Sequence, residues 1–156
     1  MHELKSKITF LLMKIYKAHR QRAEAALSTL GLHAGQEMIL FQLWMEDGLP
    51  QSRLVERMGV EPPTVTKMLQ RMEKCELVER NTCANDARVS RVYLTDKGRA
   101  LEAEVKRIWE ELDAQTLAGL DEEQRATLRQ LLLLVQANVG PVQPPAASWP
   151  APACEE

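Results

Sequence analysis

The chain has few of the residues from which catalytic and metal centres are built. It contains three histidines and three cysteines in 156 residues, and His2, His19 and His33 are scattered over two segments. The sequence has no HExxH helix, nucleophile elbow, phosphate-binding loop or zinc-type spacing of cysteine and histidine. We therefore expect no enzyme, no metal and no cofactor. Because metal sites need several clustered ligands, His33 is interpreted as a helix-cap residue.

Cysteine usage and hydropathy narrow the class of protein further. Cys75, Cys83 and Cys154 are odd in number, far apart and without a CxxC pair, which indicates a reducing cytoplasm and not a disulfide scaffold. No apolar run reaches transmembrane length, and the first twenty residues lack a small-residue cleavage site, so we expect an amphipathic helix there and no signal peptide. With 45% hydrophobic residues, the sequence predicts one soluble, cytoplasmic domain with no membrane association.

The stretch from Leu49 to Thr95 organises the rest of the chain, and its first half is typical of two helices joined by a turn. Leu54, Val55 and Met58 cluster on one helical face, and Gly59 stands where a left-handed residue would end that helix. The pair Pro62 and Pro63 can open a second helix, whose first N–H groups have no partner within the helix. Its predicted buried stripe follows i, i+3, i+4, i+7 spacing and comprises Val65, Met68, Leu69 and Met72.

The opposite face of this second helix is rich in hydrogen-bond donors and cations. It comprises Thr64, Lys67, Gln70, Arg71 and Lys74, with Thr66 beside it. Such side chains suit the DNA major groove, where they can contact base edges or phosphates. A charged face that is merely solvated is the alternative interpretation.

A short hairpin follows the second helix. Residues 77–80 and 90–94 are rich in β-branched or aromatic residues and flank a polar tip, which predicts two strands. Val92 and Leu94 alternate with Arg91 and Tyr93, so one face is expected to point inward. The pattern predicts a mainly α protein with a small β-hairpin wing, that is, a winged helix-turn-helix.

From about Leu32 to Leu101 the sequence resembles the MarR (multiple antibiotic resistance regulator) family of transcription factors. The resemblance is carried by LHAGQ before a buried helix, PPTVTKMLQRME, the LVER strand, DAR in the wing, and LTDKG at the start of a long helix. The order and spacing of these motifs together are specific. They imply a two-fold dimer with intertwined terminal helices that binds double-stranded DNA at an inverted-repeat operator, and a small aromatic or phenolic effector.

The polar face of the second helix and the family resemblance together indicate which residues contact DNA. In the recognition helix these are Pro63, Thr64, Thr66, Lys67 and Gln70 for bases, and Arg71 and Lys74 for phosphate. In the wing, the resemblance places Arg88 in the minor groove with Asp86 orienting it, and Arg91 lies on the outward strand face as a phosphate contact. A narrow groove concentrates negative potential, which favours a guanidinium at a hairpin tip. A flexible charged loop tip is the alternative.

Several positions depart from the family pattern. Val55 stands where the first helix usually has Ala, Leu49-Pro50 replaces the usual Ser or Thr cap, and the first helix lacks the reactive cysteine of hydroperoxide sensors. Cys75 stands where a small residue, often Gly, follows the second helix, so we expect it to pack locally. Cys83 falls in the wing tip and is the better candidate for a redox-active thiol.

The remaining segments read as helices. Residues 3–28 carry a seam with 4, 3, 4 spacing, and residues 34–47 are apolar nearly all round, which predicts a central helix with Trp44 in the core. Thr95 is expected to cap one long helix to about Thr116, with a seam of Leu101, Val105, Ile108 and Leu112. Asp121 and Gln124 form a capping box for a last helix.

These patterns predict one domain over residues 1–139, with dimerisation helices at 1–30 and 99–139 around a winged region at 31–98, and a disordered Pro/Ala-rich tail at 140–156. Residues 51–98 hold nine Lys and Arg against seven Asp and Glu, whereas residues 99–156 hold five against ten. The net charge of −2 therefore conceals a mildly basic motif.

The preferred hypothesis is a dimeric repressor released by a small molecule. The alternatives are a redox-sensing regulator that uses Cys75 or Cys83, and a helical dimerisation module without DNA binding. No motif indicates the effector-binding residues.

Overall fold

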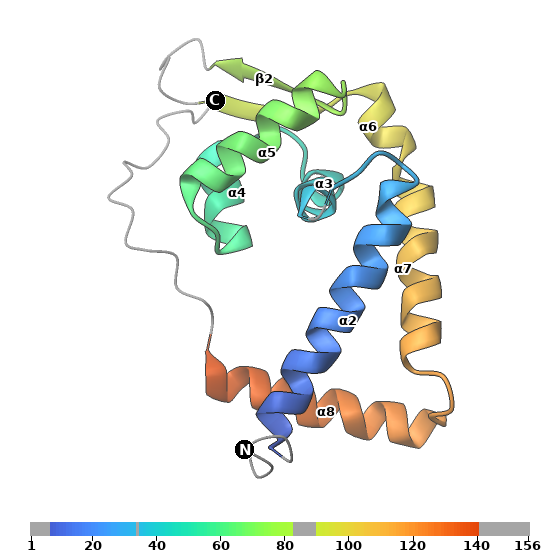
Figure 1. The fold of residues 1–156 in the computed structure, drawn as a ribbon. Coiled ribbons are helices and arrows are strands. Elements are labelled where there is room, and N and C mark those ends of the chain that lie inside the picture. Colours follow the sequence, from blue (N-terminus) through green and yellow to red (C-terminus); the bar gives the residue numbers. More distant parts are fainter. Residues whose placement is uncertain (1–6, 34, 83–89, 141–156) are drawn as a thin grey trace. The chain divides into compact units, whose positions relative to one another are not determined.

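The computed structural model describes residues 7–33, 35–82 and 90–140. The helices and strands, in chain order, are α2 (Ile8–Ser28), α3 (Gln36–Met45), β1 (Leu49–Pro50), α4 (Gln51–Met58), α5 (Pro62–Lys74), β2 (Val78–Thr82), β3 (Ser90–Leu94), α6 (Asp96–Ala100), α7 (Glu102–Thr116) and α8 (Glu122–Val139). The protein is thus mainly helical with one small antiparallel sheet (Figure 1). The predicted fold class, a winged helix with helices at both ends of the chain, is confirmed.

The chain forms two compact units. One consists of residues 1–34 and 103–119, and the other of residues 35–102 and 120–156. In the first unit, α2 and α7 meet through the rings of His19 and Trp109, whose centroids are 5.7 Å apart. The second unit contains α3 to α6, the sheet and α8.

The helix-turn-helix has the predicted boundaries. Gly59 ends α4 in a left-handed conformation with a φ of 62°, and Pro62 and Pro63 open α5. Val65, Leu69 and Met72 of α5 are fully buried, as are Leu54 of α4 and Ile39 and Leu40 of α3. A shared apolar core of α3, α4 and α5 therefore determines how deeply the recognition helix sits.

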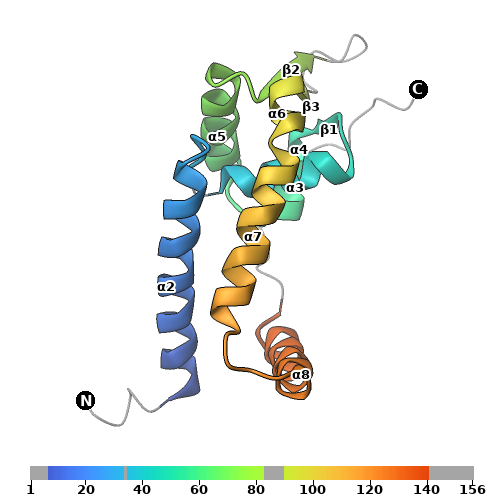
Figure 2. The same ribbon diagram turned by 90° about the vertical axis from the view of Figure 1, so that its right-hand side faces the viewer.

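The sheet has one strand more than predicted. Its order is β1-β3-β2, with Val78 opposite Leu94 and Thr82 opposite Ser90 in the hairpin, and Leu49 opposite Val92 at the other edge. Figure 2 shows the three strands close to the start of α6. A two-residue strand ending in proline has no periodicity of its own, so only the pairing with β3 reveals it. Leu49-Pro50, noted as an unusual helix cap, is this edge strand, and β2 begins at Val78 and not at Leu77.

Two helices differ from their predicted extent. The helix predicted for residues 34–47 spans Gln36–Met45, with Gly35 as N-cap, so His33 is not its cap, and Ala34 lies outside the described residues. It is not buried all round, because Met38 and Met45 are exposed. The helix predicted for residues 3–28 begins at Ile8 within the described residues, and residues 3–6 lie outside them.

The long helix predicted after Thr95 is divided in two. The Thr95 side chain caps α6 as expected, accepting a hydrogen bond from the Gly98 N–H. Leu101 interrupts the helix with φ −73° and ψ −13°, angles close to those of a 3₁₀ turn, and α7 follows. The capping box of Asp121 and Gln124 at the start of α8 is confirmed.

Candidate nucleic-acid interface

One face of α5 carries most of the base and phosphate contacts that were predicted on the recognition helix. Side chains three, six, seven and ten residues after Thr64 share its face, which is about 15 Å long at 1.5 Å per residue. The exposed residues on α5 are Pro63, Thr64, Lys67, Gln70, Arg71 and Lys74. The structure thus brings six of the seven residues predicted on the recognition helix to the surface together.

Thr66, the seventh residue, is half-buried and already hydrogen-bonded. Its hydroxyl donates to the Pro62 carbonyl at 3.0 Å and accepts from the Gln51 side-chain amide at 2.8 Å. Gln51 is the first residue of α4, so this contact joins the two helices of the motif. The sequence offered no signal for it, because a single glutamine at a helix start has many possible partners.

The C-terminal half of α5 is tied to the wing by a bidentate ion pair. Arg80 of β2 donates from Nε to Glu73 Oε1 at 2.9 Å and from a terminal nitrogen to Glu73 Oε2 at 2.6 Å. Hydrogen bonding to this carboxylate raises the pKa of the Arg80 guanidinium, and burial opposes the shift. Since Glu73 is the only carboxylate within α5, pairing it with Arg80 leaves the charge of Lys67, Arg71 and Lys74 dominant on the exposed face.

The strands place the base of the wing beside α5. Arg91 lies on the central strand β3, opposite Asn81 and Pro50. A terminal nitrogen of its side chain donates to the Gly48 carbonyl at 3.0 Å, so the residue is partly committed to the sheet. Asp86 and Arg88, the predicted minor-groove pair, and Cys83 lie outside the described residues.

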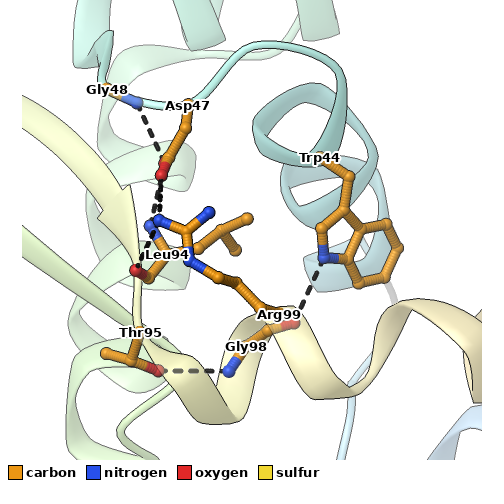
Figure 3. A network of polar contacts seen from close by, with 7 residues as sticks. All are labelled: Trp44, Asp47, Gly48, Leu94, Thr95, Gly98 and Arg99. Atoms are coloured by element: carbon orange, nitrogen blue, oxygen red, sulfur yellow. Dashed lines mark hydrogen bonds and ion pairs between the residues drawn. The ribbon is translucent and has the colours of Figure 1, made fainter.

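A polar network behind the interface locks the start of α6 onto the sheet (Figure 3). Asp47 accepts from the N–H groups of Gly48 and Leu94, both at 2.9 Å, and from Arg99 at 2.5 Å. The Trp44 indole donates to the Gly98 carbonyl at 3.1 Å. Trp44 was predicted to lie in the core. It is half-buried and meets Phe41 edge-to-face, so it packs at the edge of the core and not fully within it.

Gly98 explains the glycine of the LTDKG motif. A Cβ atom at this position would lie 2.1 Å from the Leu77 carbonyl oxygen, far inside van der Waals contact. The same carbonyl accepts a hydrogen bond from the Thr95 N–H at 3.1 Å. Only glycine permits the backbone of α6 to approach the end of the recognition-helix turn this closely.

Cys75 does not pack locally as predicted. It is an exposed free thiol at the C-cap of α5. The left-handed residue that ends the helix is Glu76, with φ 58°. The Leu77 N–H donates to the Met72 carbonyl, five residues earlier, at 2.9 Å, as in a Schellman motif, so the glycine-like role falls one position later than expected.

Membrane spans and clusters of metal ligands are both absent from the described residues. No helix within them combines the length and apolar character that spanning a bilayer requires. In the same part of the chain, no three His, Cys, Asp or Glu side chains gather closely enough to hold a metal ion.

These features define a winged helix-turn-helix with an exposed, cationic recognition helix. The MarR family model matches residues 32–90, which contain the helix-turn-helix and strand β2 and end at the first residue of β3. Over this segment the chain is similar to the MarR family.

Solved structures share this fold. MarR from E. coli in its apo form is 25% identical, with 83% of this chain and 96% of that chain covered and a TM-score of 0.71. A MarR transcriptional regulator from Methanosarcina mazei Go1 is 24% identical, with 85% and 96% covered and a TM-score of 0.75. A MarR family protein from Listeria monocytogenes, solved with a 26mer DNA, is 23% identical, with 86% and 89% covered and a TM-score of 0.74.

Proposed function

We propose that this protein is a cytoplasmic, homodimeric transcriptional regulator that binds double-stranded DNA at an inverted repeat. The observation that carries the proposal is the exposed face of α5, on which Lys67, Arg71 and Lys74 stand beside Thr64 and Gln70 while Glu73 is neutralised by Arg80. A solvated face alone would not need its one carboxylate turned away into an ion pair. The Listeria relative solved with DNA supports the same reading.

The division of labour along α5 follows from side-chain chemistry. Thr64, Lys67 and Gln70 can form hydrogen bonds with base edges, and Pro63 can contact a thymine methyl group. Arg71 and Lys74 lie in the last turn, where they suit phosphates flanking the groove. Arg88, oriented by Asp86, would enter the minor groove, and Arg91 would contact phosphate beside it.

Dimerisation is proposed through the terminal helices, within residues 1–30 and 99–139. On α2, Ile8, Leu11 and Ile15 are exposed, and on α8 the exposed set is Leu131, Leu132, Leu133, Leu134, Val135 and Val139. Apolar faces of this extent usually pack against another protein surface, and a second copy is the simplest one. Two recognition helices would then lie about 34–36 Å apart on the DNA.

We further propose that the regulator is a repressor released by a small aromatic or phenolic ligand. This part rests on the family resemblance. A redox-sensing regulator remains the second candidate, because Cys75 is an exposed thiol.

The test is selection of bound duplexes from a random library, followed by affinity measurement at several salt concentrations, with and without oxidant. We expect an inverted repeat to be enriched. Three phosphate contacts per copy, from Arg71, Lys74 and Arg91, make six per dimer and would give a slope of log affinity against log salt of about −5. An oxidant response lost in Cys75→Ser would favour the redox-sensing reading. If no duplex is enriched, the protein is not a sequence-specific DNA binder.

A further inference from the structure

The contact between Gln51 and Thr66 suggests a role for a residue that the proposed DNA contacts do not include. Gln51 donates from its side-chain amide to the Thr66 hydroxyl at 2.8 Å, and Thr66 donates to the Pro62 carbonyl at 3.0 Å. The two bonds form a short chain from the start of α4 to the first turn of α5. Both side chains are half-buried.

The hydroxyl of Thr66 has no free proton with which to donate a hydrogen bond to DNA. A threonine hydroxyl has one proton and two lone pairs. Its proton goes to Pro62 and one lone pair is taken by Gln51. While both bonds exist, Thr66 cannot donate to a base acceptor or a phosphate.

The start of α5 has few other directional restraints. Glu61, its N-cap residue, makes no side-chain capping bond. Val65 and Leu69 are fully buried and set the depth of the helix, but apolar contacts are non-directional and constrain its rotation weakly. A hydrogen bond at one side of the first turn constrains rotation directly, and Lys67 and Thr64 stand next to that bond in sequence.

We propose that Gln51 and Thr66 form a positioning pair that holds the first two turns of α5 in the rotation required for base contacts. The inference rests on the proposed function and deepens it: Gln51 affects sequence recognition through Thr66, and Thr66 supports Thr64 and Lys67 and does not read a base. Loss of either side chain therefore misplaces the same neighbours.

The experiment is a double-mutant cycle on DNA affinity with Gln51→Ala, Thr66→Val and the double variant, measured by fluorescence anisotropy on the selected duplex and on a scrambled one. Each of the three variants is expected to bind the selected duplex about 3- to 10-fold more weakly, with equal losses because the two residues act as one unit. The scrambled duplex should lose less, since phosphate contacts dominate there. Thr66→Ser, which keeps the hydroxyl, should restore affinity.

Matched controls separate positioning from loss of fold. Thr116 of α7 makes the same hydroxyl bond to the carbonyl four residues earlier, at 2.6 Å, so Thr116→Val removes an equivalent local bond far from α5 in sequence. Gln115→Ala is the control for the glutamine change. Both controls should bind like the parent, and the melting temperatures of all variants should stay close to the parent value.

Several outcomes overturn the inference. If Thr66→Val changes the preferred base at one position and Gln51→Ala does not, Thr66 reads that base itself. If the two losses multiply in the double variant, the residues act independently. Parent-like binding by both single variants removes the pair's role but leaves the regulator intact, whereas a parent protein that prefers no duplex removes the proposed function and this inference with it.

Discussion

The winged region and the terminal helix α8 differ in how far their apolar side chains are buried. In residues 35–102, side chains such as Ile39, Leu54 and Leu69 are completely buried, and polar ties such as Glu73 with Arg80 fix the elements around them. On α8 no residue is buried, and Leu134 is 63% exposed. The winged region therefore buries its apolar side chains within one chain, whereas α8 leaves its apolar side chains exposed.

The α7 helix shows that a helix outside the winged region does not necessarily expose its apolar stripe. Its sequence spacing matched that of α2, and both were predicted to face a second copy. In the structure Val105, Ile108 and Leu112 are buried, while Ile8 on α2 is 73% exposed. Among the terminal helices, the exposed large apolar side chains therefore lie on α2 and α8, and these are the surfaces on which the proposed dimer depends.

The largest effect is expected from charging α8. Leu131→Asp with Leu134→Asp should leave the protein monomeric at micromolar concentration, because each leucine contributes about 1.5–3 kcal/mol on burial and symmetry doubles the loss. Sedimentation velocity measures this. Ala126→Asp with Thr127→Asp adds the same charges before the leucine run and should dissociate the dimer less. A parent protein that is already monomeric would refute the proposed dimer.

The winged region is expected to be most sensitive at Gly98. In Gly98→Ala the new Cβ would meet the Leu77 carbonyl, 2.1 Å away, and the overlap should lower the free energy of unfolding by roughly 3 kcal/mol. Urea denaturation at fixed protein concentration measures it. Gly119→Ala is the control: its φ is +85° but nothing lies within 4 Å of the new Cβ, so about 1 kcal/mol is expected. Equal losses would mean that the close approach contributes nothing.

Along α5 the comparison is between base and phosphate contacts. Gln70→Ala should weaken binding by about 1–3 kcal/mol and relax the preference at one base position in each half-site. Lys74→Ala should weaken all duplexes alike and reduce the salt slope by about two, one per copy. Both are read from affinity on a set of single-base operator variants. Identical profiles for the two variants would contradict this division.

In the wing, Arg88→Ala should lower affinity for every site, and most strongly for sites with A·T-rich flanks, where the minor groove is narrow. Asp86→Ala should act in the same direction with a smaller loss, since it would remove only the group proposed to orient the arginine. Affinity for operators with A·T-rich or G·C-rich flanks tests both. Parent-like affinity of Arg88→Ala at moderate salt would restrict the interface to α5.

The smallest expected effect is the difference in coupling energy between an ion pair of the winged region and an ion pair on α7. The side chains of Arg80 and Glu73 are 25% and 30% exposed, and a double-mutant cycle on unfolding should give a coupling energy of about 1 kcal/mol. The pair of Arg107 and Glu111 on α7 is open to solvent, so its coupling should be too small to resolve. A coupling as large in α7 as in the wing would show that partial burial does not strengthen the first pair.

The local patterns of the sequence account for much of the fold. Gly59, the Pro62-Pro63 pair and the Asp121 capping box act over four to seven residues, and each was found where expected. Of the predicted buried stripe on α5, Val65, Leu69 and Met72 are buried and Met68 is half-buried. These local patterns depend on backbone sterics and helical spacing, which neighbouring residues determine. The exposed recognition face follows from the same spacing, because burying one stripe leaves the opposite one in solvent.

Tertiary contacts decided the rest. Strand β1 exists only through its pairing with β3, and the reason for glycine at position 98 is the carbonyl of Leu77, 21 residues earlier. The sequence alone suggests that Thr66 is an exposed base contact. In the structure the side-chain amide of Gln51, 15 residues earlier, donates a hydrogen bond to its hydroxyl. The apolar stripes of α2 and α7 have the same spacing in the sequence. Only the packing in the structure shows that the α7 stripe is buried and that the first half of the α2 stripe is exposed. Periodicity reveals which side chains must be buried, but the surface that buries them lies far away in the chain or on another molecule.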